Sequence, residues 1–112
     1  MIHYEVSITE QAERDLQDIF DYIALELLSP DHAAGQLDRL EAAIENLEFF
    51  PERHRKFEFE PWRSRNLRVL PVDHYVVFYI PDHNELTVTV IRVIYGGRDI
   101  NTQLERYTNY KT

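Results

Sequence analysis

The chain contains no cysteine, and glycine is rare, with three among 112 residues. The lack of cysteine excludes a disulfide framework and fits a reducing compartment. The glycines, Gly35, Gly96 and Gly97, are too few for a loop that cradles phosphates, which argues against a nucleotide-binding fold. No window reaches the roughly 18 apolar residues of a membrane span, and residues 1–6 lack the features of a signal peptide. We therefore expect a cytoplasmic protein without a membrane segment.

Histidine is present, but not in a pattern that binds metal. None of the five histidines pairs with another at the spacing of a metal site, and most fall in predicted turns or at strand starts. They are His3, His32, His54, His74 and His83. We predict no metal site and no cofactor. A chain of 112 residues holds one core and is too short to divide, so residues 1–112 are expected to form one domain.

Acidic and basic residues are unevenly distributed along the chain. Residues 1–50 carry 12 acidic and 2 basic side chains, whereas residues 51–112 carry 8 acidic and 10 basic ones. The net charge of -8 therefore comes from the first half. Charges further apart than about 10 Å are largely screened at moderate salt, so the second half can present a basic surface on an acidic protein.

The segment 86–95 is the most strand-like in the chain. Its apolar residues alternate with a period of two, which places Leu86, Val88 and Val90 on one face and Val93 on the other. Both faces are largely apolar. A strand that is apolar on both faces is covered on both, so we expect this segment in the centre of a sheet.

The first half predicts one strand followed by two helices. Residues 4–8 alternate between apolar and polar, and Thr9 then offers its hydroxyl as a helix N-cap. From there apolar residues recur at three- and four-residue spacing as far as Leu27. Pro30 is well tolerated in the first turn of a helix and begins a second one, which Pro51 closes. The two helices are expected to form a hairpin that packs on the sheet.

The second half predicts a basic loop, three strands and a last helix. Residues 52–65 mix arginine and lysine with aromatic residues and lack periodicity, so we expect a loop whose aromatic side chains pack against the core. Three strands follow, over 67–72, 75–80 and 86–95. A short helix over 102–110 is anchored by Leu104 and Tyr107. The predicted fold class is α+β, with an N-terminal strand, a helical hairpin, a three-stranded antiparallel meander forming one curved sheet, and a short C-terminal helix.

Four short motifs carry a resemblance to a known family. They are Ala12 to Leu16, Asn66 to Arg68, Tyr75 to Tyr79 and Ile91 to Asp99. In this order they resemble the RelE/ParE superfamily of bacterial toxins over nearly the whole chain, and the chain is more similar to ParE-like members. The resemblance implies the toxin of a two-gene type II toxin–antitoxin module, neutralised by a cognate antitoxin that wraps around it.

The resemblance leaves two activities open. RelE-like members are ribosome-dependent endoribonucleases that cut mRNA, which requires a proton acceptor, a cation and a proton donor around the scissile phosphate. ParE-like members inhibit DNA gyrase by binding. The arginine that follows the tyrosine of the third strand in RelE-like enzymes is replaced here by Val76, which cannot hold a phosphate. The resemblance therefore favours the ParE-like activity, with the ribonuclease as one alternative and a non-toxic, decayed binding module as another.

Arginines and tyrosines near the sheet supply the candidate site, because guanidinium groups bind phosphates and tyrosines stack on bases or transfer protons. If the chain is a ribonuclease, the candidate catalytic residues are Arg65, Arg68, Tyr95, Arg98 and Tyr107. A second acid and base set combines Arg98 with Glu58 or Glu60. The candidate target-binding residues are Arg68, Arg92 and Arg98. The alternative is that these arginines form ion pairs, with acidic residues of the helices or, for Arg98, with Asp99.

The resemblance also implies partners. Antitoxins of this family often bury an amphipathic segment along the toxin, so Phe49, Phe57 and Trp62 are candidate antitoxin contacts if they are not part of a minor core. The other expected partner is DNA gyrase or, for the ribonuclease, the ribosome with its mRNA. The expected assemblies are a homodimer or a toxin–antitoxin hetero-oligomer.

Overall fold

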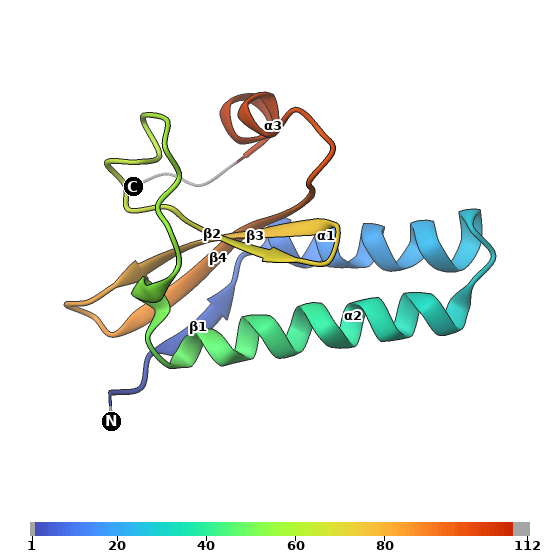
Figure 1. Cartoon of the computed structure of the whole chain (residues 1–112), viewed down its shortest axis with the longest axis horizontal. Helices are drawn as coiled ribbons and strands as arrows, with labels where there is room; N and C mark the ends of the chain where they lie inside the picture. The colour runs from blue at the N-terminus through green and yellow to red at the C-terminus, as the bar shows by residue number, and fades with distance from the viewer. Residues whose placement is uncertain (1, 109–112) are drawn as a thin grey trace.

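The computed structural model describes residues 2–108, and its element order confirms the predicted α+β class (Figure 1). The helical half comprises β1 (Glu5–Ile8), α1 (Glu10–Asp21), the π-helical turn η1 (Tyr22–Glu26), α2 (Pro30–Glu45), and the 3-10 turns η2 (Asn46–Glu48) and η3 (Pro51–Arg53). The second half comprises β2 (Arg68–Val72), β3 (Tyr75–Asp82), β4 (Thr87–Tyr95) and α3 (Ile100–Arg106). All four strands belong to one sheet, in the order β1-β4-β3-β2.

Strand β4 lies inside the sheet, as its two apolar faces predict. It pairs in parallel with β1 and antiparallel with β3, and β3 pairs antiparallel with the edge strand β2. The antiparallel meander of the last three strands is therefore confirmed. Leu86 was expected to begin β4 and face the core, but it belongs to the preceding turn, where its φ of 53° ends the extended conformation. Its side chain is exposed.

A β-bulge changes which residues of β4 share a face. The register between β3 and β4 shifts at Phe78/Tyr79, where β4 contains one extra residue, Ile91. Val93 therefore packs in the same core cluster as Val90, although strict alternation placed the two on opposite faces. Because of the bulge, the residues of β4 that follow Ile91 point to the opposite faces of the sheet from those that strict alternation predicts.

The hairpin of α1 and α2 covers one face of the sheet and extends beyond it (Figure 1). The backbone N–H of Ala12 donates to Oγ1 of Thr9 at 3.1 Å, which confirms the predicted N-cap of α1. The α-helix ends at Asp21, earlier than predicted, and continues as the π-helical turn η1. Leu27, which was expected in the core, is 57% exposed because this end of the hairpin has no sheet beneath it.

Loop 54–67 and α3 cover the other face of the sheet. Phe57 and Trp62 are buried there, which confirms that aromatic residues of the loop pack against the core, although Phe59 is 51% exposed. Leu104 anchors α3 and is buried, as predicted. Tyr107 was expected to be a second anchor but is exposed, because α3 ends one residue before it. Residues 109 and 110 of the predicted helix lie outside the described residues.

Candidate functional site

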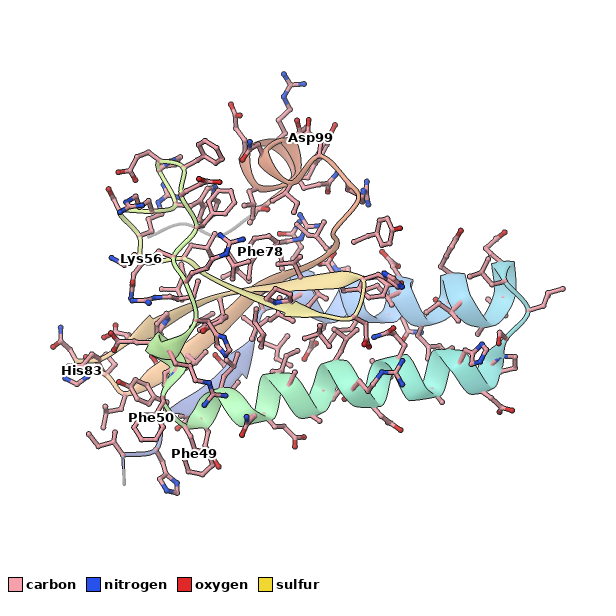
Figure 2. All side chains as sticks on the ribbon, viewed as in Figure 1. Phe49, Phe50, Lys56, Phe78, His83 and Asp99 are labelled. Carbon is pink, nitrogen blue, oxygen red and sulfur yellow. The ribbon has the colours of Figure 1, made fainter. Side chains whose placement is uncertain are left out.

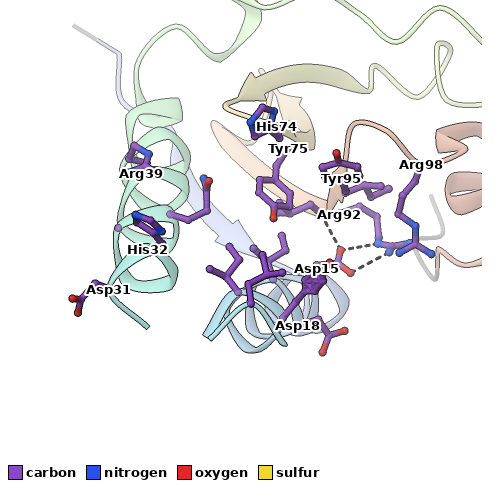
Figure 3. A pocket seen from close by; sticks show the side chains of 18 residues that line it. Asp15, Asp18, Asp31, His32, Arg39, His74, Tyr75, Arg92, Tyr95 and Arg98 are labelled. Carbon is purple, nitrogen blue, oxygen red and sulfur yellow. Dashed lines mark hydrogen bonds and ion pairs between the residues drawn. The ribbon is translucent and has the colours of Figure 1, made fainter. Parts of the chain in front are cut away.

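A groove of about 940 Å³ lies between the outer half of the helical hairpin and the ends of β3 and β4 (Figure 3). Apolar side chains from both layers line it, among them Ile19, Ile23, Leu27, Val93 and Ile94. Charged side chains of both signs surround this apolar surface, among them Asp15, Asp18, Asp31, Arg39, Arg92 and Arg98. Tyr75 and Tyr95 also line the groove, with ring centroids 5.8 Å apart. The groove can therefore receive an amphipathic partner.

Arg92 lies in the wall of the groove, but its charge is used inside the protein. The side chain is 7% exposed, and its Nε donates to Asp15 Oδ2 at 2.7 Å. Its Nη2 donates to Asp15 Oδ1 at 3.0 Å, which makes the pair bidentate. Its Nη1 donates to the carbonyl of Tyr107 at 2.9 Å and to Oγ1 of Thr108 at 3.2 Å. Arg92 thus forms the ion pair with the acidic helices that was the alternative to a target contact, and its assignment to the target-binding set is corrected.

Arg68 is likewise engaged within the protein. Its side chain is 14% exposed, and its Nη1 donates to the carbonyl oxygens of Glu52 and His54, both at 2.9 Å. Its Nη2 donates to Asn66 Oδ1 at 3.1 Å. These bonds hold the start of loop 54–67 against the edge strand β2. The geometry therefore makes Arg68 a residue that positions this loop, which corrects its assignment to the target-binding set.

Arg98 is exposed and lines the groove just beyond the end of β4. Its guanidinium group forms no hydrogen bond or ion pair with any residue in the range 2–108. The expected alternative, an ion pair with Asp99, is not formed, because the Asp99 carboxylate caps α3 and accepts from Thr102 N–H at 3.2 Å and Thr102 Oγ1 at 2.7 Å. These hydrogen bonds lower the pKa of Asp99. Of the three predicted target contacts, Arg98 alone offers its charge to a partner.

Two of the three remaining catalytic candidates lie near Arg98, and the third does not. Tyr95 shares the groove with it, and Tyr107 shares a smaller neighbouring hollow with it. Arg65 instead lies over the ring of Trp62, with its guanidinium carbon 4.9 Å from the ring centroid.

The sheet register separates Arg68 from this group as well. Arg68 lies opposite Tyr79, whereas Tyr95 lies opposite Tyr75. The two positions are about 13 Å apart along the strand. Arg65 and Arg68 line neither the groove nor the smaller hollow that contain Arg98.

The glutamates of the second proposed set do not supply a base beside Arg98 either. The Glu60 carboxylate accepts from the backbone N–H of Ser64 at 2.7 Å and from its Oγ at 2.6 Å. These two hydrogen bonds lower the pKa of Glu60, so it is a weaker proton acceptor than a free glutamate. Neither Glu60 nor Glu58 lines the groove that contains Arg98.

The sequence over residues 6–100 matches the family described as ParE toxin of type II toxin-antitoxin system, parDE. The chain belongs to this ParE toxin family. The match spans β1 to the start of α3 and so includes the groove and Arg98. No curated protein sequence matches the chain.

Solved structures similar to this ParE-family chain come from both branches of the RelE/ParE superfamily. A chromosomal ParDE toxin–antitoxin system from P. aeruginosa is 16% identical, with 85% of this chain and 98% of that chain covered and a TM-score of 0.66. The toxin–antitoxin complex RelBE2 from Mycobacterium tuberculosis is 24% identical, with coverages of 85% and 93% and a TM-score of 0.61. A mutant of the E. coli toxin RelE in the free state is 13% identical, with coverages of 88% and 88% and a TM-score of 0.62. These similarities show the superfamily fold.

Sequence reasoning missed the apolar end of the hairpin in this ParE-family toxin. Four large apolar side chains there are between 50% and 82% exposed, namely Tyr22, Leu25, Leu27 and Leu28. The available signal was the apolar spacing of the first helix, which continues past Asp21 to a point where the sheet cannot cover it.

Within residues 2–108, no three histidine, aspartate or glutamate side chains are grouped so as to hold a metal ion. No helix in that range is long and apolar enough to span a bilayer.

The turn between β2 and β3 is fixed to α2 beside the groove of this toxin. The Asp73 carboxylate accepts from Nε of Arg39 at 2.8 Å and from Nε2 of Gln36 at 3.0 Å. The hydrogen bond from Arg39 and then that from Gln36 lower the pKa of Asp73. This tie holds the sheet end of the groove at a set position relative to the hairpin.

We expect Asp73→Asn to make stability less dependent on pH in the acid range. A carboxyl whose pKa is lower in the folded state stabilises the protein fully above its unfolded pKa of about 3.9, and this contribution is lost as pH falls through the folded value. Urea unfolding at a series of pH values below about 5 will measure the slope. Arg39→Gln should flatten the same acid limb, because Arg39 makes the main contribution to the lowered pKa. An acid limb unchanged in both variants would contradict this prediction.

Proposed function

We propose that this type II toxin inhibits DNA gyrase by binding, with Arg98 as a target contact, and does not cleave RNA. The observation that carries the proposal is the isolation of Arg98. Ribonuclease chemistry at a phosphate requires several charged or proton-transferring groups around one point. Here Arg92 is paired with Asp15, and Arg68 is bonded to the loop. A single exposed cation beside apolar and tyrosine side chains suits recognition of a protein surface.

Val76 supports the same proposal. It stands where the resemblance to RelE-like ribonucleases implies an arginine, and its side chain is half-buried against the second core cluster. A valine there contributes packing and no charge. A protein that acts by binding loses nothing through this exchange, whereas a nuclease loses a phosphate ligand.

We further propose that the cognate antitoxin occupies the groove. The earlier candidates Phe57 and Trp62 are buried core residues, and Phe49 is half-buried, with its ring edge against His3 at 4.8 Å between centroids. These three side chains therefore offer little of their own surface to a partner. The groove instead combines an apolar lining with charges of both signs, which matches an amphipathic segment. Because Arg98 lines the same groove, an antitoxin bound there covers the proposed target contact and so neutralises the toxin.

Arg98→Ala is expected to reduce gyrase inhibition roughly tenfold or more, because a charged residue at the centre of a contact can dominate binding. The measurement is DNA supercoiling by purified gyrase with increasing toxin, together with growth after induction. The free energy of unfolding should stay unchanged, since the side chain has no partner within residues 2–108. Arg14→Ala is the matched control, because Arg14 is an exposed arginine whose one ion pair is with Glu10 in the same helix, at 3.5 Å.

The same strains distinguish the alternatives. Cleavage of mRNA inside translating ribosomes, lost in Arg98→Ala and retained in Arg14→Ala, would replace the gyrase proposal with a RelE-like ribonuclease. Growth that continues normally during expression of the folded wild-type protein without its antitoxin would point to the decayed binding module. Inhibition of gyrase by wild type and Arg98→Ala alike would remove Arg98 from the contact while leaving the target in place.

A further inference from the structure

The loop over residues 53–65 carries basic side chains that the proposed function does not use. Five cations lie on it, namely Arg53, Arg55, Lys56, Arg63 and Arg65. None of them forms an ion pair within residues 2–108. The acidic residues that do form ion pairs in this range, such as Asp15 and Asp73, pair with arginines that lie outside the loop. With its two acidic residues, Glu58 and Glu60, counted, the loop keeps a net positive charge of +3 (five cations minus two acids).

The loop is held in one shape by bonds that leave the side chains of Arg55, Lys56 and Arg63 free within residues 2–108, whereas Arg53 donates to Phe49 and His54 and Arg65 lies over Trp62. Phe57 and Trp62 are buried as anchors, and the backbone N–H of Phe57 donates to the carbonyl of Leu67 at 2.8 Å. The exposed Glu60 carboxylate is held by Ser64, accepting from its backbone N–H at 2.7 Å and from its Oγ at 2.6 Å. A preformed loop presents its side chains without a large ordering cost on binding.

Lys56 and Arg63 are exposed cations of this loop. Both act electrostatically on Glu60 and help to lower its pKa. Figure 2 shows Lys56 projecting from the loop, away from the helical hairpin. Neither side chain donates to any group within residues 2–108, so both remain available to a partner.

The acidic half of the molecule does not cancel this surface. The hairpin of α1 and α2 lies on the opposite face of the sheet from the loop (Figure 1). A helix with its side chains is about 10 Å thick, so the outer acidic faces are more than a Debye length of about 8 Å from the loop. A polyanion approaching the loop therefore meets its local positive charge and not the net charge of -8.

We propose that loop 53–65 binds the phosphate backbone of a nucleic acid, separately from the groove. Four of its five cations are arginines, whose forked donors fit phosphate oxygens. The ring of Phe59 is 51% exposed beside them and offers a surface on which a base can stack. This combination of cations and an exposed ring favours a nucleic acid, whose bases can stack on the ring, over an acidic protein surface, which carries no bases. The surface goes beyond the gyrase and antitoxin contacts proposed above.

The experiment is fluorescence anisotropy with the full chain and labelled single-stranded DNA, duplex DNA or RNA, at about 50 and 200 mM salt. Wild type should bind at the lower salt and lose affinity at the higher. Lys56→Gln/Arg63→Gln should reduce the slope of log affinity against log salt by about 1.4 for single strands or 1.8 for the duplex, the value for two lost phosphate contacts. Phe59→Ala should weaken single-strand binding about fivefold or more and leave duplex binding unchanged.

Arg14→Gln/Arg39→Gln is the matched control, because it removes the same charge from two exposed arginines of the helical hairpin and should leave the slope unchanged. Absence of binding to all three probes at the lower salt would overturn the proposal, as would an equal loss in the control. Binding to DNA, to RNA or to both supports it and identifies the source of the phosphates. If light scattering instead shows a salt-sensitive dimer that Lys56→Gln/Arg63→Gln dissociates, without nucleic-acid binding, the loop contacts a second copy and the proposal fails. Gyrase is absent from the assay, so its result is independent of the supercoiling test.

Discussion

Arg92→Ala is expected to lower the free energy of unfolding by about 3 to 5 kcal/mol, because removal of one partner from a buried ion pair leaves the other charge uncompensated. The charge left without a partner in this variant is the carboxylate of Asp15, whose side chain is 13% exposed in the pair. The substitution also removes the bonds from Arg92 to Tyr107 and Thr108, which tie the chain after α3 to the sheet. Urea unfolding followed by circular dichroism will measure the change.

The exposed pair of Arg39 and Asp73 supplies the control. Its side chains are 57% and 40% exposed, so Arg39→Ala should cost no more than about 1 kcal/mol. A double-mutant cycle with Asp15→Ala should show that the double variant loses less stability than the two single variants combined, because neither charge is then left alone. A loss in Arg92→Ala as small as that in Arg39→Ala would mean that the buried pair contributes little to the fold.

Features of the fold that depend on neighbouring residues were predictable from the sequence. The cap at Thr9, the helix start at Pro30 and the central position of β4 all follow from local spacing and side-chain chemistry. The bulge at Ile91 was not predictable in this way. Its position is set by the pairing of β4 with β3, and every residue in the segment is equally compatible with uninterrupted alternation.

The candidate site was only partly predictable, for a related reason. A sequence identifies an arginine but not the acid that will neutralise it, and Asp15 lies 77 positions from Arg92. Arg98 differs because it follows the end of β4 after Gly96 and Gly97, where the ladder stops and no neighbouring element covers it.

The burial or exposure of the apolar candidates depends in the same way on elements that lie far away in the sequence. Phe57 and Trp62 lie in a basic, aperiodic segment whose aromatic residues were expected to pack against the core, and folding places them beneath the loop. Leu27 lies in a regular apolar pattern that reads as core, yet the hairpin carries it past the sheet. Leu27 is uncovered because the sheet ends before it, and the length of a sheet cannot be predicted from a local sequence pattern.

Leu27→Asp is expected to weaken binding of the antitoxin by about 2 to 4 kcal/mol, or roughly 30- to 1000-fold in Kd. Leu27 lines the groove and is 57% exposed, so a partner seated there buries it, and an aspartate in its place would be buried without a counter-charge. Titration calorimetry with the protein encoded beside this toxin will measure the affinity. Growth during co-expression will show whether the antitoxin still protects the cell.

Leu25→Asp is the matched control for this prediction. It makes the same chemical change two residues earlier, within the π-helical turn that ends just before Leu27, but Leu25 is 69% exposed and does not line the groove. Its effect on antitoxin binding should stay within about 0.5 kcal/mol. Both variants should retain the wild-type unfolding midpoint, since neither side chain is buried in the free toxin. If the two substitutions weakened the antitoxin equally, the contact would lie over the whole tip of the hairpin; if neither did, the antitoxin would bind elsewhere and Arg98 would need another means of being covered.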